Sequence, residues 1–84
     1  MEEKEVGKIT HYFERAKVAV LALKEPVKLG DKVHIKGTAT DLTQVVGSLQ
    51  LEHQPIQTAE PGMDAALLVD SPVHEHDHIY KVIG

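Results

Sequence analysis

The sequence predicts an all-β fold, a small barrel or sandwich of about six short strands. Short segments alternate between apolar and polar residues, as strands with one buried face do, and proline and glycine separate them. No segment keeps the i, i+3, i+4, i+7 apolar spacing of an amphipathic helix over about ten positions. The chain has 84 residues and no cysteine, so we expect one small domain whose aliphatic core stabilises the fold without disulfides.

The first two predicted strands differ in their expected burial. Gly7, Ile9, His11 and Phe13 share one parity, which predicts a strand with these four residues on a single face. Residues 17–23 consist of Lys17 followed by a continuous apolar run, which is typical of a strand buried on both faces or crossing a barrel wall.

Three further strands are predicted from short patterns. Residues 32–37 alternate cleanly, so Val33 and Ile35 are expected to face the core. Lys32, His34 and Lys36 are expected to face solvent. Residues 65–69 and 79–83 are the last two candidates, and both are rich in aliphatic residues.

A longer alternating stretch covers residues 42–53. Gly47 within it predicts a sharp bend or a bulge, and Pro55 is expected to end the strand. The residues predicted to share one face of this strand are Val45, Gly47, Leu49 and Leu51.

Five residues are interpreted as structural turn positions and not as chemistry. Gly30 permits a positive φ, and Asp31 can hydrogen-bond back to the turn backbone. Pro61 and Gly62 suit a type II turn before the strand that follows, and Gly37 closes the segment that contains Val33 and Ile35.

The charge is unevenly distributed along the chain. The net charge is −4, but residues 1–42 hold eight Lys/Arg and seven Asp/Glu, whereas residues 43–84 hold one Lys and six Asp/Glu. Nonspecific nucleic-acid binding requires a dense basic surface, which the chain as a whole does not provide.

A local basic face in the first half is the alternative, although lysines solvated at turns are the simpler interpretation. Tyr12 and Phe13 could stack on bases beside it, or Phe13 could fill the barrel end while Tyr12 covers it. The candidate basic residues are Arg15, Lys17, Lys24, Lys28, Lys32 and Lys36.

Two stretches, read together, resemble a known family. Residues 27–37 read Val-Lys-Leu-Gly-Asp-Lys-Val-His-Ile-Lys-Gly, and residues 46–53 read Val-Gly-Ser-Leu-Gln-Leu-Glu-His, with Pro61-Gly62 eight residues later. In this order they resemble the second, β-barrel domain of translational GTPases such as elongation factor Tu and elongation factor 1-alpha. The resemblance is nearest to small stand-alone translation elongation factor-like proteins.

This resemblance implies a six-stranded Greek-key barrel over residues 5–84, preceded by a loose N-terminus at residues 1–4. It also implies a non-enzymatic binding module that contacts the ribosome, tRNA or a translation-related protein. The family's aminoacyl-end pocket would fall on the strand that holds Gln50 and His53, where an amide replaces the family's carboxylate at position 50.

Several functions are excluded or disfavoured. The chain has no Gly-x-x-x-x-Gly-Lys-Ser/Thr phosphate loop, so we expect no bound nucleotide and no GTPase activity. There is no cysteine, and Ser48 and Ser71 lie in no nucleophile motif, so the protein is predicted not to be an enzyme and to need no cofactor.

The stretch His74-Glu75-His76-Asp77-His78 leaves three hypotheses open. On a regular strand the three imidazoles would share a face and could bind zinc or copper, which suits a small metal- or ligand-binding barrel. The resemblance instead implies a polar turn before the last strand. A pH-responsive role is the third hypothesis, because imidazoles change charge near neutral pH.

The chain carries no apolar run long enough to cross a membrane, and its first residues are acidic. We therefore expect a soluble cytoplasmic protein with no membrane partner.

Overall fold

The computed structural model describes residues 2–83, which form ten β-strands and no helix. This confirms the all-β prediction. Residues 2–83 accordingly contain no helix long and apolar enough to cross a membrane. The strands are β1 (Glu3–Phe13), β2 (Val18–Leu23), β3 (Val27–Lys28), β4 (Lys32–Lys36), β5 (Asp41–Val45), β6 (Leu49–Leu51), β7 (Gln54–Ile56), β8 (Thr58–Ala59), β9 (Ala65–Leu68) and β10 (His78–Val82).

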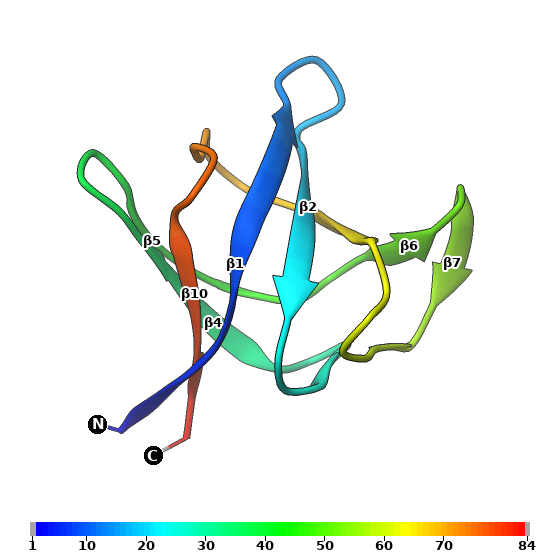
Figure 1. Ribbon diagram of the computed structural model, residues 1–84, viewed down its shortest axis with the longest axis horizontal. Helices are drawn as coiled ribbons and strands as arrows, with labels where there is room; N and C mark the ends of the chain where they lie inside the picture. Colours follow the sequence, from blue (N-terminus) through cyan, green and yellow to red (C-terminus); the bar gives the residue numbers. More distant parts are fainter. Residues whose placement is uncertain (1, 84) are drawn as a thin grey trace.

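Eight of these strands form one antiparallel sheet that curls around a single aliphatic core (Figure 1). Their order is β5-β4-β10-β1-β2-β9-β6-β7, and β3 pairs with β8 in a separate small sheet. Strands β5 and β7 are the two edges of the large sheet, so the described residues form a curled, open sheet. The strand ladders of residues 2–83 therefore do not form the expected six-stranded Greek-key barrel.

Strand β1 lies at the centre of the sheet, with β10 on one side and β2 on the other. It starts at Glu3, within the segment expected to be loose, and Glu3 and Lys4 pair with Val82 and Lys81. Its register shifts twice, between Glu5 and Gly7 against β10 and between Ile9 and His11 against β2. Such shifts bend and twist a strand, which lets an 11-residue strand follow a strongly curled sheet.

The second register shift reverses the faces of the strand beyond it. Ile9 is fully buried, but Tyr12 packs against the core and Phe13 is 50% exposed. The prediction that Ile9 and Phe13 lie on a single face of the strand is therefore wrong. The extra residue at the shift moves every later side chain to the opposite face.

The predicted strand 42–53 is two strands separated by residues 46–48. Gln44 and Val46 are buried, whereas Val45 is 58% exposed, so the predicted face is inverted in β5. Leu49 is buried again in β6, because the break at residues 46–48 shifts the alternation by one position. The Gln44 amide faces inward because it donates to the Leu68 carbonyl oxygen at 2.9 Å and its oxygen accepts the backbone N–H of residue 70 at 2.8 Å.

Strand β7 contains Pro55, which was expected to end the preceding strand. Pro55 pairs with Gln50 of β6, and β7 is an edge strand. A proline has no backbone N–H, so an edge position is where a sheet tolerates it.

The turn glycines hold the backbone geometry that those positions require. Gly30 has a φ of 90° and Gly62 a φ of 91°. The Asp31 carboxylate accepts a hydrogen bond from the Lys28 backbone N–H at 3.0 Å. The Asp31 carboxylate also forms an ion pair with Lys81 Nζ at 3.3 Å, which links this turn to β10.

Gly37 packs directly against the buried carboxylate of Asp77. A Cβ at position 37 would lie 1.8 Å from Asp77 Oδ1. The same carboxylate accepts the His74 backbone N–H at 2.8 Å, and Asp77 is only 5% exposed. Gly37 therefore provides the space in which Asp77 organises the turn before β10.

We predict that Gly37→Ala lowers the free energy of unfolding by about 1–3 kcal/mol, the usual range for overpacking a buried site. The matched control is Gly47→Ala, because a Cβ there meets nothing within 4 Å and its φ is not positive. This control should leave stability unchanged or slightly raised. Urea unfolding followed by circular dichroism measures both, and equal stabilities for the two variants would contradict the role assigned to Gly37.

Candidate functional site

A groove of about 690 Å³ lies between the β1–β2 hairpin and the β6–β7 turn, on the outer face of the sheet. In Figure 1 these two turns project from the sheet beyond the ends of β1 and β2 and of β6 and β7. Most of the groove's lining is apolar, although it lies outside the core.

The floor of the groove is a row of directly paired residues across three strands. Val20 of β2 pairs with Ala66 of β9, and Ala66 pairs with Gln50 of β6. Directly paired residues of antiparallel strands point to the same face, so these three side chains form one surface. Val18 continues the apolar floor toward the hairpin.

The first wall is the β1–β2 hairpin. Phe13 is the large apolar side chain of this wall, and half of its surface is exposed. Its ring meets the His11 ring edge-on with centroids 4.4 Å apart, and His11 Nδ1 lies 3.1 Å from Glu75 Oε2. His11 thus links the Phe13 ring to Glu75 in the turn before β10.

The second wall is the two-residue turn between β6 and β7. Glu52 has a φ of 52° and His53 a φ of 66°, so two consecutive non-glycine residues adopt the left-handed conformation. Each such residue costs roughly 1–2 kcal/mol, and turns of this kind usually use Asn-Gly. Strain of this type concentrates at binding sites, where the side chains matter more than the stability of the turn.

The groove brings together five of the residues singled out from the sequence: Tyr12, Phe13, Arg15, Gln50 and His53. Lys17 follows in the same hairpin but is not part of the lining. The expected basic face is not assembled around this groove, because the other candidate lysines lie on different strands. Those lysines are Lys24 directly after β2, Lys28 in β3, and Lys32 and Lys36 in β4.

Sequence reasoning missed the acidic members of the groove and most of its floor. Glu14, Glu52 and Asp64 line it, yet each is an ordinary exposed acid in the sequence. One available signal was the spacing of two residues between Leu51 and Gln54, which suits a tight hairpin turn.

The three histidines of the last turn do not converge. His74 Nδ1 lies 2.9 Å from Thr40 Oγ1, His78 Nδ1 contacts the Glu5 carboxylate, and His76 takes a φ of 73° in the position where turns favour glycine. Within residues 2–83 no three His, Cys, Asp or Glu side chains are arranged to hold a metal ion. The hypothesis of a metal-binding barrel built on this turn is therefore not supported by the geometry.

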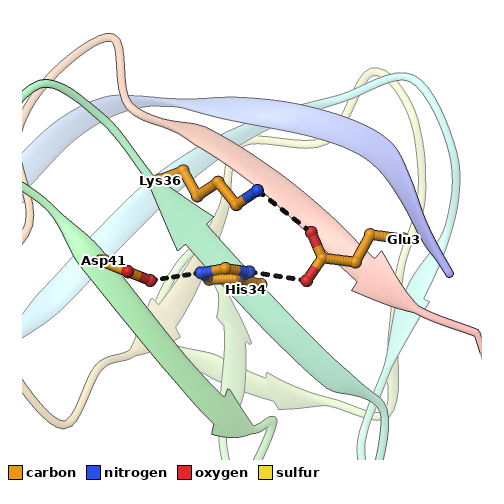
Figure 2. Close-up of polar contacts among 4 residues, drawn as sticks. All are labelled: Glu3, His34, Lys36 and Asp41. Atoms are coloured by element: carbon orange, nitrogen blue, oxygen red, sulfur yellow. Dashed lines mark hydrogen bonds and ion pairs between the residues drawn. The ribbon is translucent and has the colours of Figure 1, made fainter. Parts of the chain in front are cut away.

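A fourth histidine, His34, lies in a polar cluster with Glu3, Lys36 and Asp41 (Figure 2). His34 Nδ1 lies 2.6 Å from Glu3 Oε2, and its Nε2 contacts Asp41 Oδ1. Lys36 Nζ lies 3.5 Å from the other oxygen of Glu3 and 5.3 Å from the centre of the Tyr80 ring. This His34 cluster ties β4 to the start of β1 and to β5.

Both ring nitrogens of His34 face carboxylates, and only the imidazolium can donate from both at once. Hydrogen bonds to Asp41 and to Glu3 raise the pKa of His34. The hydrogen bond from His34 is the main cause that lowers the pKa of Glu3. The Glu3 contact is the better shielded one, because the Glu3 side chain is 23% exposed and that of Asp41 is 82% exposed.

Comparison with known proteins gives one curated relative and a set of solved structures. An uncharacterized protease of Methanocaldococcus jannaschii is 29% identical over 77 residues, covering 90% of this chain and 19% of the protease. The chain thus spans about a fifth of the length of this relative. No family model matches the chain.

The solved structures share the fold. The C-terminal domain of a Geobacillus thermoleovorans protein named as a U32 peptidase has a TM-score of 0.84 and 18% identity, covering 95% of this chain and 93% of that domain. Its selenomethionine variant has a TM-score of 0.81 and 18% identity, covering 90% and 96%. At this identity the likeness is one of fold.

These findings overturn the resemblance to the second domain of translational GTPases. Both the curated relative and the matched structures carry peptidase names. The prediction of a translation-related binding module is therefore wrong, and the expected ribosome and tRNA partners were based on that resemblance alone. The prediction that the protein is not an enzyme is contradicted by the same peptidase names.

We predict that the His34 cluster makes stability depend on pH. A raised pKa of His34 means that its stabilisation is present below the ordinary value of about 6.5 and is lost as pH rises through the folded-state pKa. A lowered pKa of Glu3 means that its stabilisation is present above about 4.3 and is lost as pH falls further. The contribution of the cluster is therefore largest between these two values.

The measurement is urea unfolding of the native chain and of His34→Gln at several pH values. The variant should lose most stability near about pH 5.5 and much less near about pH 8.5. His53→Gln, which removes an exposed imidazole of the groove, is the control and should show no such difference. A stability deficit of His34→Gln that is the same at all pH values would reject the cationic cluster.

Proposed function

We propose that this chain is a polypeptide-binding β-domain that serves a U32-type peptidase, with the groove as its binding site. The comparisons support a role as one domain of a larger peptidase, because the chain covers 19% of one protease and 93% of a C-terminal domain from another peptidase-named protein. Proteases act on polypeptides. A domain that serves a protease would therefore contribute a surface that binds a polypeptide segment.

The observation that carries the proposal is the exposed apolar surface around Phe13. The single phenylalanine of the chain lies outside an otherwise aliphatic core, beside Val18, Val20 and Ala66 on the outer face. Apolar surface gathered in a groove and rimmed by polar residues marks an interaction site.

The chemistry of the groove suits a side chain from an extended polypeptide. An apolar side chain placed against Phe13 and Val20 would gain about 1.5–3 kcal/mol from leaving water. Gln50 presents an amide that both donates and accepts hydrogen bonds, as a polypeptide backbone requires. His53 and Glu52 would bound the segment on the β6–β7 side.

The turn at Glu52 and His53 adds a second line of support. Residues held in a strained conformation persist where their side chains are needed, and both residues line the groove. A turn selected for stability alone would use residues that tolerate a positive φ.

We predict that Phe13→Ser weakens polypeptide binding about tenfold or more, because it removes one buried apolar contact worth about 1.4 kcal/mol or above. Binding is measured on an immobilised array of 12-residue peptides of random sequence probed with the labelled 84-residue chain. Val45→Ser is the matched control, since Val45 is 58% exposed and does not line the groove.

Both variants should keep the melting temperature of the native chain within a few degrees, since both side chains are largely exposed. Equal loss of binding in the two variants, or no loss in either, would contradict the groove as the binding site.

A further inference from the structure

The rim of the groove carries an excess of negative charge. Three carboxylates line it, Glu14, Glu52 and Asp64, and Arg15 is the one lining side chain that is always cationic. All four side chains are exposed. The rim therefore has a net charge of about −2 when His53 is neutral.

The carboxylates of the rim are not neutralised from within the described part of the chain. Within residues 2–83 every ion pair closer than 4.0 Å involves other acids, namely Glu3, Glu5, Glu25, Asp31, Asp41, Glu75 and Asp77. The rim carboxylates consequently remain free to pair with charge on a bound molecule. Seven of the ten acids outside the rim, by contrast, lie within 4.0 Å of a lysine or histidine nitrogen.

From this complementarity we infer that the groove selects a polypeptide segment in which an apolar side chain lies within two residues of lysine or arginine. The inference rests on the proposed function and specifies its ligand. The apolar side chain packs on Val20 and Ala66 beside Phe13, and the flanking basic side chains extend to Glu14, Glu52 and Asp64.

The geometry of an extended segment fits this arrangement. Successive residues of an extended chain point to opposite sides, so the neighbours of a side chain that faces the floor point away from it. The long stems of lysine and arginine let their charged ends turn back to the rim while the stem covers apolar surface. A short polar side chain in the same place would not reach the carboxylates.

The same charges disfavour nucleic acid. Binding to a phosphate backbone depends on lysine and arginine that replace its counterions, and the rim has one arginine against three carboxylates. The aromatic pair at positions 12 and 13 is thus placed in a surface that repels a polyanion.

The test uses the 84-residue chain and three labelled peptides that differ only around a central phenylalanine, which is flanked by lysine, by serine or by glutamate. Fluorescence anisotropy at about 20 mM and about 300 mM salt measures each affinity, because screening shortens to a few ångströms at the higher value. A labelled single-stranded RNA of similar length is the fourth probe.

We expect the lysine peptide to bind about tenfold tighter than the serine peptide at low salt, and the glutamate peptide to bind most weakly. The advantage of the lysine peptide should shrink at high salt, whereas the affinity of the serine peptide should stay constant. The RNA should not bind.

A pair of triple variants assigns the effect to the rim. Glu14→Gln, Glu52→Gln and Asp64→Asn together should equalise the lysine and serine peptides. The matched control neutralises three exposed acids outside the groove, through Glu2→Gln, Glu60→Gln and Asp70→Asn, and should keep the preference. Both triple variants change the net charge of the chain equally.

The outcomes separate this inference from the proposed function. Equal binding of all three peptides, or a preference abolished equally by both triple variants, overturns the charge selectivity and leaves a polypeptide-binding groove. Binding of none of the peptides overturns both. Binding of the RNA in place of the lysine peptide overturns the inference in favour of a different class of ligand.

Discussion

The fold depends on one constraint, which is that β1 must stay paired on both sides while it bends around the core. Where the register shifts near Val6, the Val6 carbonyl oxygen accepts the backbone N–H of Lys24 at 2.7 Å. Next to it, a Cβ on Gly7 would lie 2.3 Å from the Ala22 carbonyl oxygen, so glycine alone permits this approach of β2. Farther along, Ile9 exchanges two backbone hydrogen bonds of 2.8 Å with the turn before β10. Bulges of this kind are how a sheet turns without losing its hydrogen bonds.

The bend that curls the sheet also creates the groove. The shift between Ile9 and His11 turns Tyr12 toward the core and leaves Phe13 on the outer face, where β2, β9 and β6 present small and aliphatic residues. The same irregularity thus shapes both the curl of the sheet and the groove. The strained Glu52-His53 turn faces this surface from the other side, so two of the positive-φ non-glycine residues of the described chain line the groove.

The sequence was sufficient to predict the class of fold and the buried faces of strands with regular alternation. Val33 and Ile35 are fully buried, as their alternation with polar residues predicted. Alternation cannot reveal an extra residue, however, since the letters around Thr10 and around Gly47 read equally well in either register. The two wrong face assignments, at Phe13 and at Val45, both follow from such extra residues.

The candidate site was predicted in part. Tyr12, Arg15, Gln50 and His53 were named from different arguments, and the curl of the sheet places them in one groove. The family assignment failed for a different reason. The stretches that suggested it are dominated by turn chemistry, such as Gly30-Asp31 and Pro61-Gly62, and turn chemistry specifies local backbone geometry and not ancestry or function.

The position of the two tyrosines has a practical consequence for spectroscopy. The chain has no tryptophan, so its intrinsic near-ultraviolet emission comes mainly from Tyr12 and Tyr80. Tyr12 lines the groove, whereas Tyr80 lies beneath Lys36 at the His34 cluster. Replacing either tyrosine by phenylalanine therefore leaves a single native fluorophore, which observes the groove in one variant and the His34 cluster in the other.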